Sequence, residues 1–198
     1  MIDEFAKQYL HDDLKWIRAV LLSKLDGLSE YDVRRPLTTT GTNLLGLVKH
    51  LSGTEARYFS EVFGRPSPWP LPRWDGDDAW SGDDMWAAEH ETREEILARY
   101  RLAGDFTDAT IDALPIDAPG YVPWWPRPNV KLFNVMVHVL TETSRHAGHA
   151  DILREQLDGR VGMGPEGKVL HGRDTAYWTD HREKVERAAE AASRLHLN

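Results

Sequence analysis

The segment from residue 130 to residue 159 most constrains what this chain can fold into, because its pattern predicts one long amphipathic helix. Apolar and ionisable residues recur along one face at intervals of three or four, the spacing that keeps side chains on one side of a helix. This face consists of Val135, Val139, Glu142, His146, His149, Leu153 and Leu157. An unpaired buried carboxylate is costly, so such groups are normally paired, hydrogen-bonded or bound to a metal. The function of the protein should therefore be sought where acid and imidazole interrupt this apolar face.

The rest of the chain also predicts helices, at residues 8–27, 44–64, about 83–113 and 174–195. No segment alternates between apolar and polar residues, with turn residues on both sides, as a half-buried strand would. We therefore expect an all-α fold, a four-helix bundle over residues 8–159 with an additional C-terminal helix in an extension over residues 160–198. A chain of 198 residues is long enough to bury one full core, so we expect a single domain over residues 1–198.

Two long loops rich in proline and tryptophan, at residues 65–82 and 115–129, interrupt the helices. They allow two interpretations: their tryptophans cover the ends of the bundle with apolar area, or they line a substrate pocket. The tryptophans in or beside these loops are Trp69, Trp74, Trp80, Trp86, Trp124 and Trp125. The other two, Trp16 and Trp178, fall in helical patterns and are expected in the core. In the last helix the residues expected to face inward are Trp178, Val185, Ala188, Ala189, Ala192 and Leu195.

Charge and composition exclude several classes of protein. A formal net charge of −8 argues against a nucleic-acid binder, which needs a basic face to neutralise phosphates. The absence of cysteine excludes disulfides, thiolate metal ligands and a cysteine nucleophile, although it does not decide the compartment. Neither an apolar leader nor an apolar run of about 18 residues occurs, so we expect no membrane association and a cytoplasmic location.

The polar groups of the 130–159 helix have the geometry of a metal site. Each residue of a helix advances by about 100°, so His138, Glu142, His146 and His149 project within roughly 80° of one another. Glu142 and His146 are one turn apart and could hold the same ion, while His50 on the 44–64 helix offers a third ligand. Such a His–Glu–His set suits Zn²⁺ best, with Ni²⁺, Fe²⁺, Mn²⁺ or Co²⁺ as alternatives.

Each of these groups also has an interpretation without metal. A single inward histidine is usually a hydrogen-bonded core residue. Glu142 could form a buried ion pair with His146, or pair with Arg145 or Arg101 at the edge of the bundle. Helical geometry alone does not rank the four polar groups of the 130–159 helix as ligands.

Two sequence segments resemble a known family. KHLSGTEARYF, which contains His50, and ETSRHAGHADILREQLDG, which begins at Glu142, resemble the DinB-like four-helix metalloproteins over about residues 10–160. The closest branch is that of mycothiol-dependent maleylpyruvate isomerase and the thiol S-transferases. Its pattern has one histidine early in the second helix and, on the fourth, a histidine or glutamate four residues before His-x-Gly. The resemblance implies His50, Glu142 and His146 as metal ligands, and leaves His149 and His138 as neighbours that contact the ligands.

The resemblance also implies an activity. We expect a divalent-metal-dependent enzyme, either a mycothiol S-transferase or a thiol-dependent isomerase, in which the ion lowers the pKa of a thiol that attacks an electrophilic substrate. Because the chain has no cysteine, this thiol must arrive on a small molecule, and mycothiol is the one that the resemblance implies. Two alternatives remain, a metal-dependent hydrolase and a non-catalytic, stress-associated metal-binding bundle. We expect a monomer or a homodimer.

Overall fold

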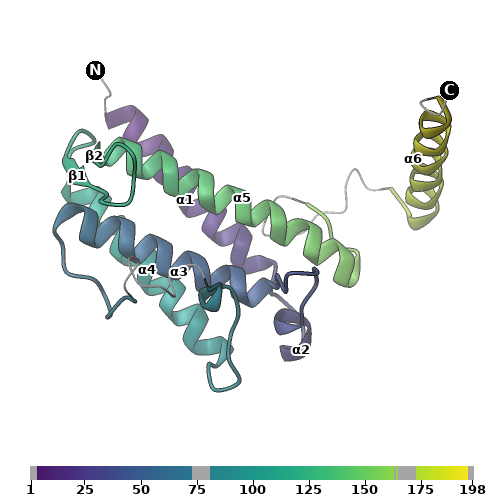
Figure 1. Cartoon of the computed structure of the whole chain (residues 1–198), viewed down its shortest axis with the longest axis horizontal. Coiled ribbons are helices and arrows are strands. Elements are labelled where there is room, and N and C mark those ends of the chain that lie inside the picture. The colour runs from purple at the N-terminus through teal and green to yellow at the C-terminus, as the bar shows by residue number, and fades with distance from the viewer. Residues whose placement is uncertain (1–3, 73–80, 163, 165–172, 196–198) are drawn as a thin grey trace.

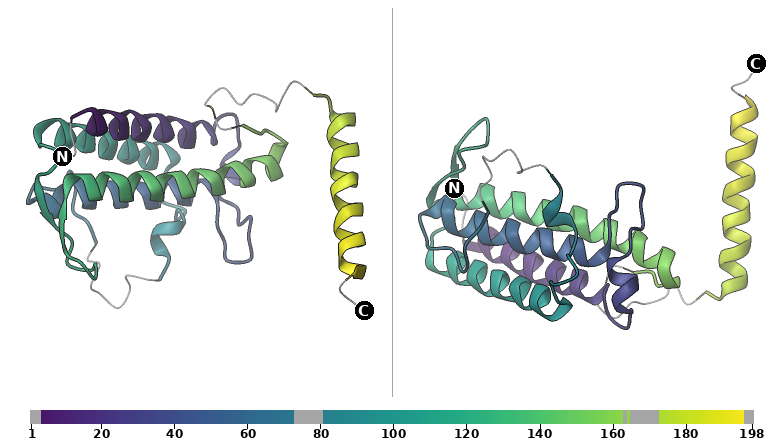
Figure 2. Two further views of the ribbon diagram at one scale, coloured as in Figure 1. Left: turned by 90° about the horizontal axis from the view of Figure 1, so that it is seen from above. Right: turned by 60° about the horizontal axis from the view of Figure 1, so that its bottom comes forward.

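The computed structural model describes residues 4–72, 81–162, 164 and 173–195. Its four long helices are α1 (Glu4–Ser23), α3 (Leu44–Ser60), α4 (Arg93–Ala113) and α5 (Leu132–Asp158). Figures 1 and 2 show these helices lying lengthwise beside one another as a bundle. The prediction of an all-α four-helix bundle is therefore confirmed.

Short elements connect the long helices. They are α2 (Glu30–Arg34), the 3-10 turns η1 (Glu61–Phe63) and η2 (Asp83–Met85), and the strands β1 (Pro119–Tyr121) and β2 (Asn129–Lys131). The two strands pair in antiparallel fashion, with Pro119 opposite Lys131 and Tyr121 opposite Asn129. The sequence did not predict this small sheet, because strands of three residues are too short to display an alternating pattern.

Local sequence signals explain where the helices that carry the site begin and end. Asn43 caps α3, since its side chain accepts a hydrogen bond from the backbone of Gly46. Gly159, with a φ of 74°, ends α5 in the left-handed conformation that glycine adopts most easily. The helix predicted at about residues 83–113 begins later, at Arg93, because Thr92 and Glu95 form a reciprocal capping box there.

The core fills the space between the long helices in two groups of buried apolar residues. One group includes Leu14, Phe59 and Val139, and the other includes Leu21, Leu51 and Leu153. Trp16 does not join them: it is 48% exposed, so the prediction that it lies in the core is wrong. Leu14, Ile17 and Leu21 form the buried stripe of α1, and Trp16 projects from the opposite side of that helix.

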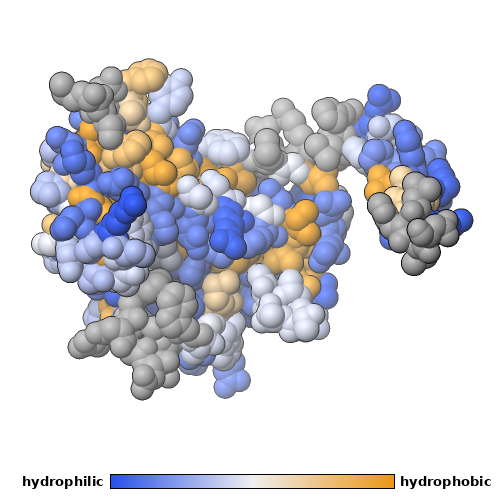
Figure 3. Space-filling view, turned by 45° about the horizontal axis from the view of Figure 1, so that its top comes forward, coloured by the Kyte–Doolittle hydropathy of each residue, from blue (hydrophilic) through white to orange (hydrophobic). Residues whose placement is uncertain are grey.

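The surface of the bundle mixes residue types. On the face seen in Figure 3, small groups of hydrophobic side chains lie among hydrophilic ones. Exposed hydrophobic residues on α1 include Phe5 and Tyr9 in addition to Trp16. Among the described residues, no helix is both long and apolar enough to span a membrane.

The C-terminal helix α6 (Thr175–Leu195) lies beyond one end of the bundle in Figure 1. Trp178 is half-buried, and the next four residues predicted to face inward are exposed, namely Val185, Ala188, Ala189 and Ala192. That prediction is wrong for these four, because an amphipathic pattern indicates an apolar face but not the surface that would cover it. The side chain of Leu195 lies outside the described residues, as do Trp74 and Trp80.

Candidate metal centre

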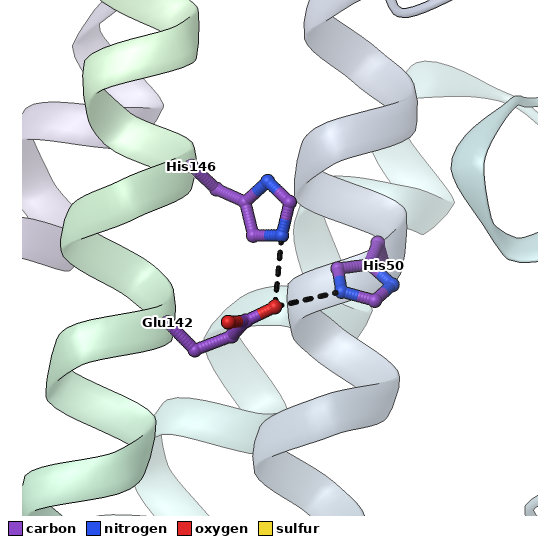
Figure 4. Close-up of side chains that lie close together, drawn as sticks. All are labelled: His50, Glu142 and His146. Carbon is purple, nitrogen blue, oxygen red and sulfur yellow. Dashed lines mark hydrogen bonds and ion pairs between the residues drawn. The ribbon is translucent and has the colours of Figure 1, made fainter.

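Three side chains from two neighbouring helices converge on the outer side of the bundle (Figure 4). His50 projects from α3, and Glu142 and His146 project from successive turns of α5. Nε2 of His146 lies 3.0 Å from Oε1 of Glu142, and Nε2 of His50 lies 3.7 Å from the same oxygen. One ligand atom from each residue lies within 4.8 Å of the other two, so the three could hold one ion.

Both imidazoles have a partner on the side away from Glu142. Nδ1 of His50 lies 2.7 Å from a carboxylate oxygen of Asp84 in η2, and Nδ1 of His146 lies 3.3 Å from Nδ1 of His149. An ionised carboxylate only accepts hydrogen bonds, so the contact with Asp84 assigns the proton of neutral His50 to Nδ1. The lone pair of Nε2 then points toward Glu142, as a metal ligand requires.

The electrostatics of the cluster favour the charge states that bind a cation. Burial opposes ionisation of Glu142, but the neighbouring His146 and His50 outweigh it and hold the pKa of Glu142 below its usual value. Burial, together with the nearby His50, lowers the pKa of His146 and so favours the neutral imidazole. A carboxylate beside a neutral imidazole, with a ring nitrogen of His50 as the third donor, is a set that fits a divalent ion.

The cluster is reachable from solvent. The side chain of Glu142 is 29% exposed, whereas those of His50 and His146 are 15% and 11% exposed. A small molecule can therefore approach Glu142 without opening of the bundle. The ion-pair partners that the structure gives Glu142 are these two histidines, not Arg145 or Arg101.

The structure places the other two histidines of α5 differently. His149 is exposed on the surface, and in the part of the chain that the structure describes it contacts the cluster through the ring of His146. His138 packs against the rings of Tyr58 and Trp125, with ring centroids 4.8 and 4.7 Å away. Burial at this position lowers the pKa of His138. The ring contacts of His138 in the described structure are thus aromatic, and it also interacts electrostatically with Glu142.

Tyr58 connects one tryptophan-rich loop to the bundle, and sequence reasoning did not single it out. Its hydroxyl oxygen accepts hydrogen bonds from the indole nitrogens of Trp124, at 3.3 Å, and Trp125, at 3.1 Å. Both tryptophans pack against the apolar core, which favours the interpretation that this loop covers the end of the bundle. The only sequence signal was spacing, since Tyr58 follows His50 by two helical turns and lies on the same side of α3.

Asp84 is the second residue that the sequence did not reveal. It lies 34 residues after His50, in the loop between α3 and α4, and no local pattern connects the two. The hydrogen bond with His50 holds the pKa of Asp84 below its usual value, despite partial burial. Asp84 is therefore an ionised neighbour of a candidate ligand.

Comparison with known proteins agrees with this geometry. Residues 9–159 match the family described as Mycothiol-S-transferase, and no curated protein matches the chain. The matched region contains the four long helices and all three residues of the cluster, and it ends at the residue that terminates α5. The chain therefore belongs to the mycothiol S-transferase family, which is DinB-like.

Proposed function

We propose that the protein is a divalent-metal-dependent mycothiol S-transferase in which His50, Glu142 and His146 hold the metal. The observation that carries this proposal is the convergence of these three side chains from α3 and α5, with their ligand atoms within 4.8 Å of one another. Membership of the family supports the thiol as co-substrate. Two imidazole nitrogens and one carboxylate form a common catalytic zinc set, so Zn²⁺ is the ion that we expect first.

A bound divalent ion would supply one piece of chemistry, the lowering of the pKa of a coordinated thiol into the neutral range. The chain supplies the rest. His50 and His146 would each offer a ring nitrogen, and Glu142 would contribute a negative charge that partly balances the ion. With Nε2 of His146 free for the ion, its Nδ1 would carry the proton and donate it to Nδ1 of His149, 3.3 Å away.

The missing cysteine supports a thiol brought by a small molecule. The exposed side of Glu142 leaves room for that thiol and for an electrophilic second substrate. All three ligands come from one chain, so the site does not require a second copy, and we expect a monomer or a homodimer. A cytoplasmic location suits this chemistry, because thiols are kept reduced there.

The test is conjugation of mycothiol to an electrophile such as a chlorodinitrobenzene by protein loaded with Zn²⁺. His146→Ala should reduce kcat/KM by about 100-fold or more, because even residues behind a ligand contribute about 10- to 100-fold. His181→Ala, an exposed position on α6, is the matched control and should leave the rate unchanged. Full activity of His146→Ala would overturn the proposal.

The same preparation separates the alternatives. Turnover of esters, amides or phosphate esters without thiol would indicate a hydrolase instead. Protein that binds no ion and conjugates no thiol would be a non-catalytic bundle, and metal analysis of protein purified without chelator detects this case directly.

A further inference from the structure

The contact between His50 and Asp84 joins two segments that are far apart in the sequence. His50 lies in the middle of α3, and Asp84 lies in the one-turn helix η2 that precedes α4. Their atoms Nδ1 and Oδ2 are 2.7 Å apart. The carboxylate of Asp84 is 54% exposed, and an exposed ion pair contributes little to stability by itself. The consequence of this contact is therefore sought in the orientation of His50.

Helix α3 has a glycine where η2 approaches it. A Cβ atom built on Gly46 would overlap the backbone carbonyl of Met85, so only glycine allows the two segments to lie this close. Gly46 precedes His50 by one helical turn and therefore lies on the same side of α3. The close approach at Gly46 brings the next turn of the helix, with His50, beside Asp84.

Lys49 of α3 also binds the same segment. Its ammonium group donates hydrogen bonds to the backbone carbonyls of Asp83, at 3.2 Å, and Trp86, at 2.8 Å. It also lies 2.7 Å from the carboxylate of Glu91, which in turn accepts a hydrogen bond from the backbone of Ala88. The backbone on both sides of Asp84 is thus fastened to α3, and the position of its side chain follows from that.

We propose that Asp84 is a positioning residue for the candidate metal centre. Gly46 and Lys49 of α3 form the docking site for η2, and this docking site holds Asp84 against His50. Asp84 accepts the Nδ1 proton of His50, and this selects the tautomer whose Nε2 lone pair faces Glu142. Without Asp84 the ring of His50 could flip or carry its proton on Nε2, and in either case the ligand would be lost for part of the time. The effect on metal binding rests on the proposed function, whereas the effect on the tautomer does not.

The first experiment measures Zn²⁺ affinity of the full chain by competition with a chelating dye at pH 7.5. Asp84→Ala should weaken affinity by about 10- to 100-fold, the usual effect of losing the partner of a ligand histidine. Asp84→Asn keeps an oxygen that can accept the proton of His50, so its Zn²⁺ affinity should fall less than that of Asp84→Ala. Asp83→Asn is the matched control, since within the described structure the carboxylate of Asp83 makes no hydrogen bond or ion pair, and it should change affinity by less than about twofold.

A second pair of variants tests the docking of η2 on α3 at Gly46, with Asp84 unchanged. Gly46→Ala should displace η2 and weaken Zn²⁺ binding as Asp84→Ala does, and the double variant should be no worse than either single one. Gly53→Ala on the same helix is the control, because in the described structure a Cβ there would meet no atom within 4 Å. Additive losses in the double variant would show that Gly46 does not act through Asp84.

The third readout needs no metal and no activity. Nitrogen-15 chemical shifts of the His50 ring in metal-free protein should report a proton on Nδ1, and in Asp84→Ala the population should shift toward the Nε2 tautomer. Unchanged shifts in Asp84→Ala would overturn the proposal, even if Gly46→Ala fails to fold. If wild-type protein binds no Zn²⁺, the proposed function fails, and the ring shifts still decide the role of Asp84.

Discussion

Glu142 of α5 and His50 of α3 are the residues through which two helices meet at the candidate metal centre, with Oε1 and Nε2 3.7 Å apart. His146 lies 3.0 Å from the same oxygen, so one carboxylate is shared between imidazoles of both helices. Any ion held by this set connects α3 to α5. Its binding is therefore coupled to the stability of the bundle as well as to chemistry.

Zinc should raise the melting temperature of the protein. A ligand present at 100 times its Kd stabilises the folded state by about 2.7 kcal/mol, which for a chain of this size is a shift of roughly 5–10 °C. Differential scanning fluorimetry with Zn²⁺ and with a chelator measures this shift. His146→Ala should remove it and His181→Ala should keep it, whereas equal shifts in all three proteins would place the ion elsewhere.

His149 should influence the centre less than His146 does. His149 contacts the ring of His146 through Nδ1 and is itself exposed, so His149→Ala should weaken Zn²⁺ binding by about 10- to 100-fold rather than abolish it. Isothermal titration calorimetry of the two alanine variants compares the losses directly. An equal loss in both variants would instead mean that His149 is a ligand.

Removal of Arg18 should destabilise the bundle strongly. Arg18 binds the fully buried Glu55 through two nitrogens, at 2.9 and 3.0 Å, and also contacts Asp108 at 2.7 Å. Burial raises the pKa of Glu55, and the charge of Arg18 opposes that rise. Arg18→Met would leave the buried carboxyl of Glu55 without its charged partner, and should lower the free energy of unfolding, measured in urea, by about 3–5 kcal/mol.

The double variant Arg18→Met with Glu55→Gln is the control for this pair. It removes both charges, so it should be more stable than Arg18→Met alone. A double variant that loses the sum of the two single losses would show that the two side chains do not act as a pair. Arg194→Met on the exposed surface of α6 should change stability by less than about 0.5 kcal/mol.

Asp158 should make the stability of the protein depend on pH in the acid range. Burial opposes ionisation of Asp158, but hydrogen bonds from Arg154 outweigh it and hold its pKa below the usual value. A carboxyl whose pKa is depressed on folding contributes stability that is complete above its unfolded pKa of about 4 and disappears as pH falls through the folded value. Asp158→Asn should therefore be less stable than wild type at pH 7, and the difference should shrink below about pH 4.

Urea unfolding at pH 7, 5, 4 and 3 tests whether this difference in stability shrinks as the pH falls. Asp13→Asn, at an exposed position on α1, removes the same charge and should leave the pH dependence of stability unchanged. A difference in the free energy of unfolding between wild type and Asp158→Asn that stays constant from pH 7 to pH 3 would contradict a depressed pKa of Asp158.

Local sequence determined most of the helices and the face of α5 on which part of the candidate metal centre lies. The spacing of Glu142 and His146 on α5 follows from helical periodicity alone, since residues one turn apart share a face. The ends of α3 and α5 follow from Asn43 and Gly159, because caps act within a few residues of the helix end. The choice of Glu142 and His146 among the four polar groups of this helix required the family resemblance, because periodicity alone does not rank them as ligands. The need for a third ligand from another helix indicated His50.

Tertiary structure decided the remainder. Asp84 follows His50 by 34 residues in the chain and contacts it because Gly46 and Lys49 hold the segment of Asp84 on α3. His138 shares the helix face of Glu142, yet it lies among aromatic rings because Tyr58 and Trp125 come from other segments. The physical reason is the same in both cases: periodicity and capping depend on near neighbours in the chain, whereas the partner of a side chain depends on which distant surfaces pack together.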